Sequence, residues 1–523
     1  MTMREWNVTP FVTEPMTDFG NAENRAAFLE AIAHVRTELG KQYPLHIGGH
    51  AVHTSDYIVS RNPAKSDEVV GEVAKASREL AEQAMKSALA AFETWKHTSV
   101  WTRASCLMKA AALMRERKHY FSAWLVIESG KNWAEADADT AEAIDFMDYY
   151  AREMLKLAET NELKPLVKLA GEDNRLTYIP LGVGIVIPPW NFPLAICAGM
   201  ASASIVAGNT IIMKPASTTP IIAYKFYELM VEAGMPADVI QYLPGSGAEI
   251  GDYLTSHPKT RFISFTGSKE IGLRINRLAA EQAPGQIWMK RVVAEMGGKD
   301  GIVVDETANI DAAADAIVAS AFGFQGQKCS AGSRAIVVAD VYDELIEKVK
   351  ERTSKLVMGS PEENAAIGPV IDKASFDKIL NAIERGKSEG RLIVGGGKGI
   401  EGGYFIEPTV FADVAPKDSL MQEEIFGPVL AIAKAKDWQE AIHIYNDTEF
   451  GLTGAFFSAE EDRIQAALQE MHCGNLYINR KCTGALVGVH PFGGFNMSGT
   501  DSKAGGHDYM LLFTQAKLTS IKL

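Results

Sequence analysis

Apolar residues recur every three to four positions in the first third of the chain, a spacing that predicts helices. The stretches with this spacing are residues 21–39, 77–96, 101–130 and 137–159. Gly130 and Asp137 are a helix stop signal and a helix start signal between the last two. Residues 160–182 lack the helical period, so we expect them to be extended and to form a projecting arm.

From residue 183 the pattern changes to short apolar strands that alternate with helices. The strand segments are 183–187, 210–213, 239–243, 262–265 and 291–294, and the helical segments are 194–207, 218–233, 248–256 and 268–283. This alternation predicts a buried parallel sheet. Sheets of this kind bind ligands at the carboxyl ends of their strands.

A second run of alternation begins at residue 301 and predicts a second α/β domain. Its strand segments are 302–304, 335–338, 429–433, 455–457 and 476–478. Residues 492–506 form a Gly-rich loop. The strand-like residues 509–521 are expected to pair with the arm at 160–182 or with a neighbouring chain.

The composition narrows the class of protein. A chain of 523 residues is too long for one core, and 47% hydrophobic with 23% charged residues is typical of a soluble protein. The net charge of -14 argues against a nucleic-acid partner. Neither a signal peptide nor a membrane-spanning run is seen. The five cysteines have no CxxC or Cys/His metal spacing, so we expect free thiols, a cytoplasmic location and no metal site.

One cysteine has surroundings that suit a nucleophile. Cys329 follows the Gly-rich segment 323–326 and precedes small residues, between a helical segment at 312–322 and a strand. The thiolate is the reactive form, and the adjacent Lys328 and backbone N–H groups are expected to favour it. The alternative is a buried structural cysteine, the commoner role of a lone Cys.

Three strands of the first run end in groups that suit a phosphate or a ribose. These groups are Lys214 and Ser217 after one strand, Gly247 after the next, and Thr266, Gly267, Ser268 and Gly272 after the third. Glycines let the backbone approach a ligand, and the N–H groups of a helix N-terminus bind anions. Each turn alone can be an ordinary turn, but three at one sheet edge predict a dinucleotide site.

Two polar side chains also follow strands of this run. Asn191 lies between prolines that fix its backbone, and its amide can either donate to an oxyanion or cap the next helix. Glu295 is followed closely by Gly297 and Gly298, so its carboxylate can swing. A carboxylate near a nucleophile can activate water as a general base.

Five motifs occur in the order and spacing of the aldehyde dehydrogenase superfamily, which the chain resembles from about residue 46 to its end. They are Pro189-Trp190-Asn191-Phe192-Pro193, Phe265-Thr266-Gly267-Ser268, Glu295-Met296-Gly297-Gly298-Lys299, Gly326-Gln327-Lys328-Cys329 and Glu424-Ile425-Phe426-Gly427-Pro428. The resemblance implies an α/β fold with a Rossmann-like NAD-binding domain, an α/β catalytic domain and a small β oligomerisation hairpin. It also implies a homodimer or a higher homo-oligomer.

The resemblance implies a division of the chain into segments. Residues 1–158 are an N-terminal extension and helices that belong to the NAD-binding domain, 159–182 the oligomerisation arm, and 183–294 the NAD-binding core. Residues 295–489 are the catalytic domain, 490–508 return to the NAD-binding domain, and 509–523 form the oligomerisation strand.

The resemblance further implies the roles of individual residues. Cys329 attacks an aldehyde, Asn191 and the backbone N–H of Cys329 hold the oxyanion, and Glu295 activates the water that releases the acid. The residues implied to bind NAD are Pro189, Trp190, Lys214, Ser217, Gly247, Thr266, Gly267, Ser268, Gly272, Glu424 and Phe426. Many relatives have Glu where this chain has Ser217. A Glu would repel the extra phosphate of NADP and Ser does not, so NADP is expected to be tolerated.

Within the superfamily the chain is most similar to dehydrogenases of glutamate γ-semialdehyde in proline and arginine breakdown. The similarity implies a small-molecule substrate site made of Glu142, Phe192, Ser330, Gly484, Ala485 and Phe492. The turn at 483–485 would hold the substrate carboxylate through backbone N–H groups. A dehydrogenase for another polar aldehyde is the alternative. A binding protein on the same scaffold would lack Cys329 or Glu295, and both are present.

Overall fold

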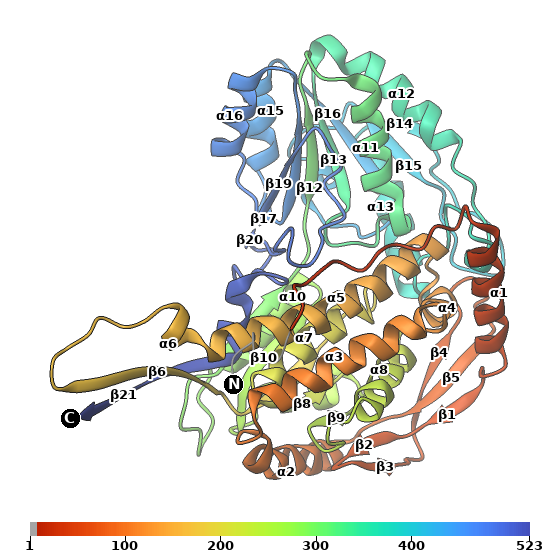
Figure 1. Cartoon of the computed structure of the whole chain (residues 1–523). Helices are drawn as coiled ribbons and strands as arrows, with labels where there is room; N and C mark the ends of the chain where they lie inside the picture. Colours follow the sequence, from red (N-terminus) through yellow and green to blue (C-terminus); the bar gives the residue numbers. More distant parts are fainter. Residues whose placement is uncertain (1–7) are drawn as a thin grey trace.

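The computed structural model describes residues 8–523; residues 1–7 of the expected N-terminal extension lie outside the described part. Two α/β bodies, each with a seven-stranded sheet, lie against each other, and a two-stranded ribbon projects from one of them (Figure 1). Within residues 8–523, no helix is long and apolar enough to cross a membrane.

The first sheet carries the expected parallel core. Its strands, in spatial order, are β11 (Arg291–Glu295), β10 (Thr260–Thr266), β7 (Val183–Ile187), β8 (Thr210–Met213), β9 (Ile240–Tyr242), β2 (Leu45–Ile47) and β3 (His50–Val52). The first five pair in parallel, and β2 and β3 extend the sheet as antiparallel strands. Because the parallel strands are apolar and buried, the sheet predicted for 183–294 is confirmed.

Helices pack around this sheet and form the largest apolar core. They are α1 (Ala22–Arg36), α2 (Arg78–Trp95), α3 (Val100–Glu116), α4 (Lys118–Ser129), α5 (Trp133–Ala158), α7 (Ala195–Val206), α8 (Pro220–Glu232), α9 (Asp252–Ser256) and α10 (Lys269–Ala280). A small sheet of β1 (Lys41–Tyr43), β5 (Val69–Ala74) and β4 (Tyr57–Arg61) lies beside them.

Two helix boundaries differ from the prediction. The single helix expected at 101–130 is two helices, because the chain breaks at Arg117 (φ -113°, ψ 26°), whose guanidinium reaches Glu232 at 2.8 Å. Helix α5 begins at Trp133 and not at Asp137. Its cap is Asn132, whose side chain accepts the Glu135 N–H at 3.0 Å.

The second sheet confirms the second α/β unit. Its strands, in spatial order, are β14 (Arg391–Val394), β15 (Thr409–Ala412), β16 (Val429–Ala435), β13 (Gly332–Val338), β12 (Asp300–Val304), β18 (Thr453–Phe457) and β19 (Asn475–Ile478). Its helices are α11 (Ile310–Phe322), α12 (Tyr342–Ser354), α13 (Lys373–Gly386), α14 (Ser419–Gln422), α15 (Trp438–Asn446) and α16 (Glu461–Glu470). The short strands β17 (Phe450–Gly451) and β20 (Phe495–Asn496) pair near its edge.

The projecting ribbon pairs β6 (Glu172–Pro180) with β21 (Thr514–Lys522), which confirms the expected pairing of the arm with the C-terminal strand. The prediction was wrong at both ends. Residues 160–163 form the short helix α6 (Thr160–Leu163), and residues 507–513 form the 3-10 helix η5 (His507–Phe513). The reason for η5 is packing, since its Tyr509 stacks on Tyr150 of α5 with ring centroids 5.3 Å apart.

Candidate active site

The candidate nucleophile lies just after a strained turn between α11 and β13. The turn η2 (Gly323–Gly326) holds Phe324 and Gln325 in the left-handed region, at φ 48° and 55°. This conformation costs free energy for residues with a side chain. The cost is offset by tertiary contacts such as the hydrogen bond from Gln325 Nε2 to the Pro369 carbonyl, at 2.8 Å. The turn therefore holds Cys329 in a defined position.

The surroundings of Cys329 favour its protonated thiol. Burial raises the pKa of this thiol, and the nearby carboxylates of Asp300 and Glu295 raise it further. Lys328 does not reverse this effect, because its Nζ forms an ion pair with Glu135 Oε1 at 2.6 Å. The expected effect of Lys328 on the thiolate stays a prediction, and forming the nucleophile requires a proton acceptor or a further positive charge in the site.

Asn191, in the connection from β7 to α7, contacts the nucleophile segment. Its side chain is buried, and its Nδ2 donates to the carbonyl oxygen of Gln327 at 3.1 Å. It does not cap α7, whose first N–H, that of Ala195, donates instead to Asp139 Oδ1 at 2.7 Å. An amide nitrogen has two N–H groups, so the second one can meet an oxyanion formed beside Cys329.

Glu295 ends β11 and is held by a residue that sequence reasoning missed. Its Oε1 accepts a hydrogen bond from Ser502 Oγ, whereas Oε2 is buried without a hydrogen-bond partner among the described residues. Burial raises the pKa of Glu295 to about 8, and the Ser502 hydroxyl lowers it. Ser502 lies in the Gly-rich loop at 492–506, where no periodicity or motif singles it out. Near neutral pH, Glu295 can therefore exist in both protonation states.

The residues expected to bind a dinucleotide follow the carboxyl ends of the parallel strands. Pro189 and Trp190 follow β7, Lys214 and Ser217 follow β8, Gly247 follows β9, and Thr266, Gly267, Ser268 and Gly272 lie at the end of β10 and in the start of α10. Ser268 caps α10, with its Oγ accepting the Ile271 N–H at 3.4 Å, and the space around Gly247 is open. Burial lowers the pKa of Lys214 to about 8. This edge fits the phosphates and ribose of a dinucleotide.

Two glycines of the motifs are required for close packing. A Cβ on Gly272 would overlap the Met296 sulfur, so this glycine lets α10 approach the end of β11. A Cβ on Gly326 would overlap the carbonyl of Gly427, so the nucleophile turn lies directly against the 424–428 motif. Gly326 excludes a larger side chain because backbone atoms fill the space, whereas at Gly272 the Met296 side chain would have to move.

The second body contributes two side chains to the edge of the first sheet where a dinucleotide is expected. Glu424 Oε1 accepts the Gly298 N–H at 3.0 Å, and burial raises the pKa of the Glu424 carboxyl. Phe426, at φ 60°, packs edge-on against Trp190 with ring centroids 5.4 Å apart. The two bodies therefore meet where the dinucleotide is expected.

A cavity of about 180 Å³ lies beside the nucleophile. Its walls include Cys329, Glu295 and all six residues expected to bind the substrate: Glu142, Phe192, Ser330, Gly484, Ala485 and Phe492. Burial raises the pKa of Glu142 to about 8, with a further contribution from the Asp139 carboxylate. The structure thus brings the nucleophile, the candidate base and the 483–485 turn to one cavity.

Other walls of this cavity escaped sequence reasoning. Among them are Met16, Asp145 and Tyr509. Asp145 is on α5 one turn after Glu142, a spacing that can be read from the sequence. Met16 and Tyr509 reach the cavity only through the tertiary fold, so no local pattern could have found them.

The described residues contain no group of three or more His, Cys, Asp or Glu side chains that could hold a metal ion. All five cysteines are free, and four of them are buried. Cys329 is the one that reaches the cavity surface.

Residues 51–519 match the aldehyde dehydrogenase family, and the chain belongs to this family. Its relatives include the 1-pyrroline-5-carboxylate dehydrogenases of Geobacillus kaustophilus and Geobacillus thermodenitrificans, each 60% identical over 514 residues, or 98% of this chain and 99% of the relative. The solved structure of 1-pyrroline-5-carboxylate dehydrogenase from Thermus with bound NAD matches with a TM-score of 0.97 at 50% identity, covering 99% of this chain and 100% of that one. The expected family and α/β fold are therefore confirmed.

Proposed function

We propose that the chain is an NAD-dependent dehydrogenase that oxidises L-glutamate γ-semialdehyde, in equilibrium with Δ1-pyrroline-5-carboxylate, to L-glutamate in proline and arginine breakdown. The observation that carries the proposal is the shared cavity, which joins Cys329 and Glu295 to the turn at Gly484 and Ala485. Similarity over nearly the whole chain to 1-pyrroline-5-carboxylate dehydrogenases supports the same substrate.

The substrate is held at the end remote from its aldehyde. Gly484 has φ 81°, and a turn with such small residues exposes backbone N–H groups to the α-carboxylate. Phe192 and Phe492 pack on the aliphatic chain. Glu142 receives the α-ammonium, and this positive charge lowers the pKa of the carboxyl, so that Glu142 ionises when the substrate binds.

The first half-reaction builds a thioester on Cys329. The thiol gives its proton to a water molecule of the cavity, which passes it to solvent, and the sulfur adds to the aldehyde carbon to give a thiohemiacetal oxyanion. Asn191 Nδ2 and the Cys329 backbone N–H donate to this oxygen. Collapse of the thiohemiacetal restores the C=O bond and expels the aldehydic hydrogen with its electron pair, leaving the thioester.

The second half-reaction hydrolyses the thioester. Glu295 takes a proton from a water molecule, and the water oxygen attacks the thioester carbon. The C–S bond then breaks, the electron pair returns to the sulfur, and the acid is released. Because Glu295 must be ionised, this step becomes faster as the pH rises through about 8.

NAD, when bound, supplies the acceptor for the hydrogen and its electron pair. The residues that would hold it are those at the strand ends of the first sheet, together with Glu424 and Phe426. Ser217 is exposed and carries no charge, so the extra phosphate of NADP meets no carboxylate at this position. NADP is therefore accepted as a weaker alternative.

The test is NADH formation from Δ1-pyrroline-5-carboxylate, with succinate semialdehyde as the competing polar aldehyde. We expect a higher kcat/KM for the first substrate, loss of activity in Cys329→Ala by several orders of magnitude, and retained activity in the control Cys106→Ala, a buried residue of α3. A preference for succinate semialdehyde would favour the alternative substrate class. Full activity of Cys329→Ala would exclude the covalent mechanism.

The chain is further proposed to be a cytoplasmic homo-oligomer, at least a dimer. The ribbon of β6 and β21 projects from the body (Figure 1). Its exposed apolar side chains include Leu518 and Ile521. Exposed apolar groups on a projecting ribbon favour association with a second copy. The free cysteines support a reducing compartment.

A further inference from the structure

The N-terminal segment runs along α5, which forms one wall of the substrate cavity. In Figure 1 its red trace runs along α5 before it reaches α1. We call residues 11–17 the N-terminal strap. The strap has no regular secondary structure, and it precedes the part of the chain that matches the aldehyde dehydrogenase family, which begins at residue 51. The strap itself therefore lies outside the segment that matches the family.

Two carboxylates of α5 hold the strap by its backbone. Asp145 Oδ1 accepts the Glu14 N–H at 2.7 Å. Asp137 accepts the Thr17 N–H at 2.8 Å through Oδ2 and the Thr17 hydroxyl at 2.6 Å through Oδ1. The two aspartates are separated by about 12 Å of helix, and the strap between its two attachment points spans at most about 10 Å. This short stretch is therefore fixed at both of its ends along α5.

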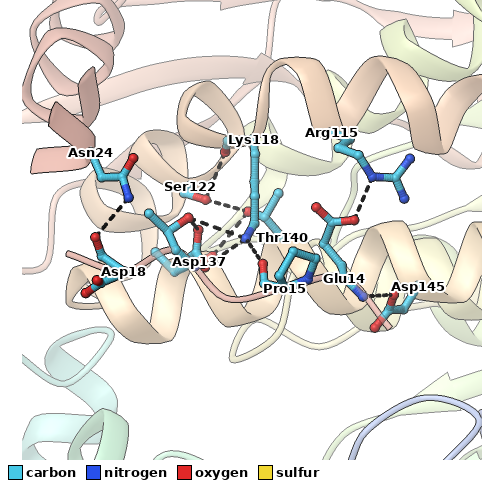
Figure 2. Close-up of polar contacts among 12 residues, drawn as sticks. Glu14, Pro15, Asp18, Asn24, Arg115, Lys118, Ser122, Asp137, Thr140 and Asp145 are labelled. Atoms are coloured by element: carbon cyan, nitrogen blue, oxygen red, sulfur yellow. Dashed lines mark hydrogen bonds and ion pairs between the residues drawn. The ribbon is translucent and has the colours of Figure 1, made fainter. Parts of the chain in front are cut away.

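Two cations of the neighbouring helices reinforce these attachments. Lys118 Nζ donates to the Pro15 carbonyl at 2.8 Å and pairs with Asp137 Oδ2 at 2.9 Å. Arg115 Nε pairs with Glu14 Oε2 at 2.6 Å. Figure 2 shows these side chains converging on the strap from α3, α4 and α5. Pro15 and Met16 thus lie between two fixed points, although both are at the surface.

The strap also contacts the loop that bears the turn at residues 483–485, which we call the anchor turn because it is proposed to hold the substrate carboxylate. Phe11 packs edge-on against Tyr149 of α5, with ring centroids 5.2 Å apart. A Cβ on Gly488 would lie 3.1 Å from Phe11, so the loop after Gly484 and Ala485 approaches the strap closely. The strap therefore bridges α5 and this loop on either side of the cavity.

The consequence of these attachments is that Met16 is held at the cavity. It lines the cavity with Glu142 and Asp145 of α5 and with Leu486 and Val487 of the loop, while 52% of its surface remains exposed. Met16 therefore lies at the mouth of the cavity, on the side of Glu142 and the anchor turn. An unbranched thioether adapts its shape to a small ligand and still occupies the space beyond it.

We infer that the N-terminal strap forms the outer wall of the substrate cavity and that Met16 limits the length of the aldehyde that the cavity accepts. The inference rests on the proposed function, because it takes the cavity beside Cys329 as the substrate site. An aldehyde that ends at the anchor turn fits inside this wall. A longer chain meets the Met16 side chain and must displace it or the strap.

The experiment compares kcat/KM for octanal and propanal in the full-length enzyme and in variants of the strap. Met16→Gly opens the wall, and we expect the octanal to propanal ratio to rise about tenfold, as is usual when an apolar pocket gains room for a chain. Met16→Trp closes it, and the ratio is expected to fall. Val12→Gly is the control, since Val12 belongs to the strap, is 76% exposed and does not line the cavity.

Because the octanal to propanal ratio is expected to change in opposite senses in Met16→Gly and Met16→Trp, the test does not depend on how well each variant folds. A variant that merely loosens the strap would change the ratio in the same sense for Gly and Trp, and such a result would overturn the role of Met16. A ratio unchanged in both variants would do the same. Failure of the proposed function appears separately, as absence of aldehyde oxidation in the unaltered enzyme or as its persistence in Cys329→Ala.

Discussion

The hydroxyl of Ser502 allows the pKa of Glu295, the candidate base, to be shifted by a predictable amount. It donates to Glu295 Oε1, the only hydrogen bond to this carboxylate from a side chain of the described residues, while Oε2 is buried without a partner. A hydrogen bond to a charged group contributes about 1.5–3 kcal/mol, and one pKa unit corresponds to about 1.4 kcal/mol. Because the bond stabilises the ionised form, Ser502→Ala should raise the pKa of Glu295 from about 8 by roughly one to two units.

The expected result is a shifted pH profile of thioester hydrolysis. The enzyme is acylated at one pH in rapid mixing and then jumped to a range of final pH values, so that the titration of Cys329 does not enter. The hydrolysis rate should rise through about pH 8 in the unaltered enzyme and through a pH roughly one to two units higher in Ser502→Ala. Acylation should change little.

Two control variants accompany this measurement. Glu295→Gln removes the titrating group, so hydrolysis should be slow and should lose this pH dependence. Ser498→Ala removes another buried hydroxyl of the same loop, which accepts the Gly451 N–H at 3.0 Å and does not touch Glu295. It should leave the midpoint unchanged. An identical midpoint in Ser502→Ala and the unaltered enzyme would refute the assignment of the pH dependence to Glu295.

The remaining predictions concern the cofactor, the anchor turn and a buried ion pair. Ser217→Glu should lower kcat/KM for NADP relative to NAD about tenfold by placing a carboxylate against the 2′-phosphate; an unchanged ratio would show that residue 217 does not contact the ribose. Ala485→Leu should raise KM for glutamate semialdehyde much more than for propanal, and glutamate should compete with the aldehyde; equal losses for both aldehydes would contradict the anchor. Lys131→Met should lower the melting temperature, because the fully buried Asp139 loses its ion-pair partner, 3.3 Å away, at a cost of about 3–5 kcal/mol. The double variant with Asp139→Asn should recover part of this loss; a melting temperature equal to that of the parent in Lys131→Met would contradict the pair's role.

Much of the fold was accessible from the sequence because its signals are local. Short, mainly apolar strands that alternate with helices predicted β7 to β11 as a parallel sheet, because such strands are buried on both faces. The start of α5 was missed although Asn132, with Glu135 three residues later, is a local start signal, and η5 was missed because Tyr509 is drawn into the core by stacking on Tyr150.

The residues of the candidate site likewise fall into those that a local motif indicates and those that only the tertiary fold brings to the site. Cys329, Asn191 and Glu295 lie in contiguous motifs, so the sequence could indicate them, although their roles and the segment boundaries stay predictions. Ser502 and Met16 reach the site through long-range contacts without a local pattern. The ion pair of Lys328 could not be read from the sequence for the same reason, because its partner Glu135 lies 193 positions away in the chain.

The central claim is that oxidation passes through a thioester on Cys329 whose hydrolysis needs Glu295. The most direct measurement is the intact mass of Glu295→Gln after mixing with NAD and Δ1-pyrroline-5-carboxylate and quenching in acid. We predict that the protein gains the mass of a glutamyl group, located on the peptide that contains Cys329, in step with one burst of NADH. Unmodified protein that has nevertheless formed a full equivalent of NADH would contradict the covalent mechanism.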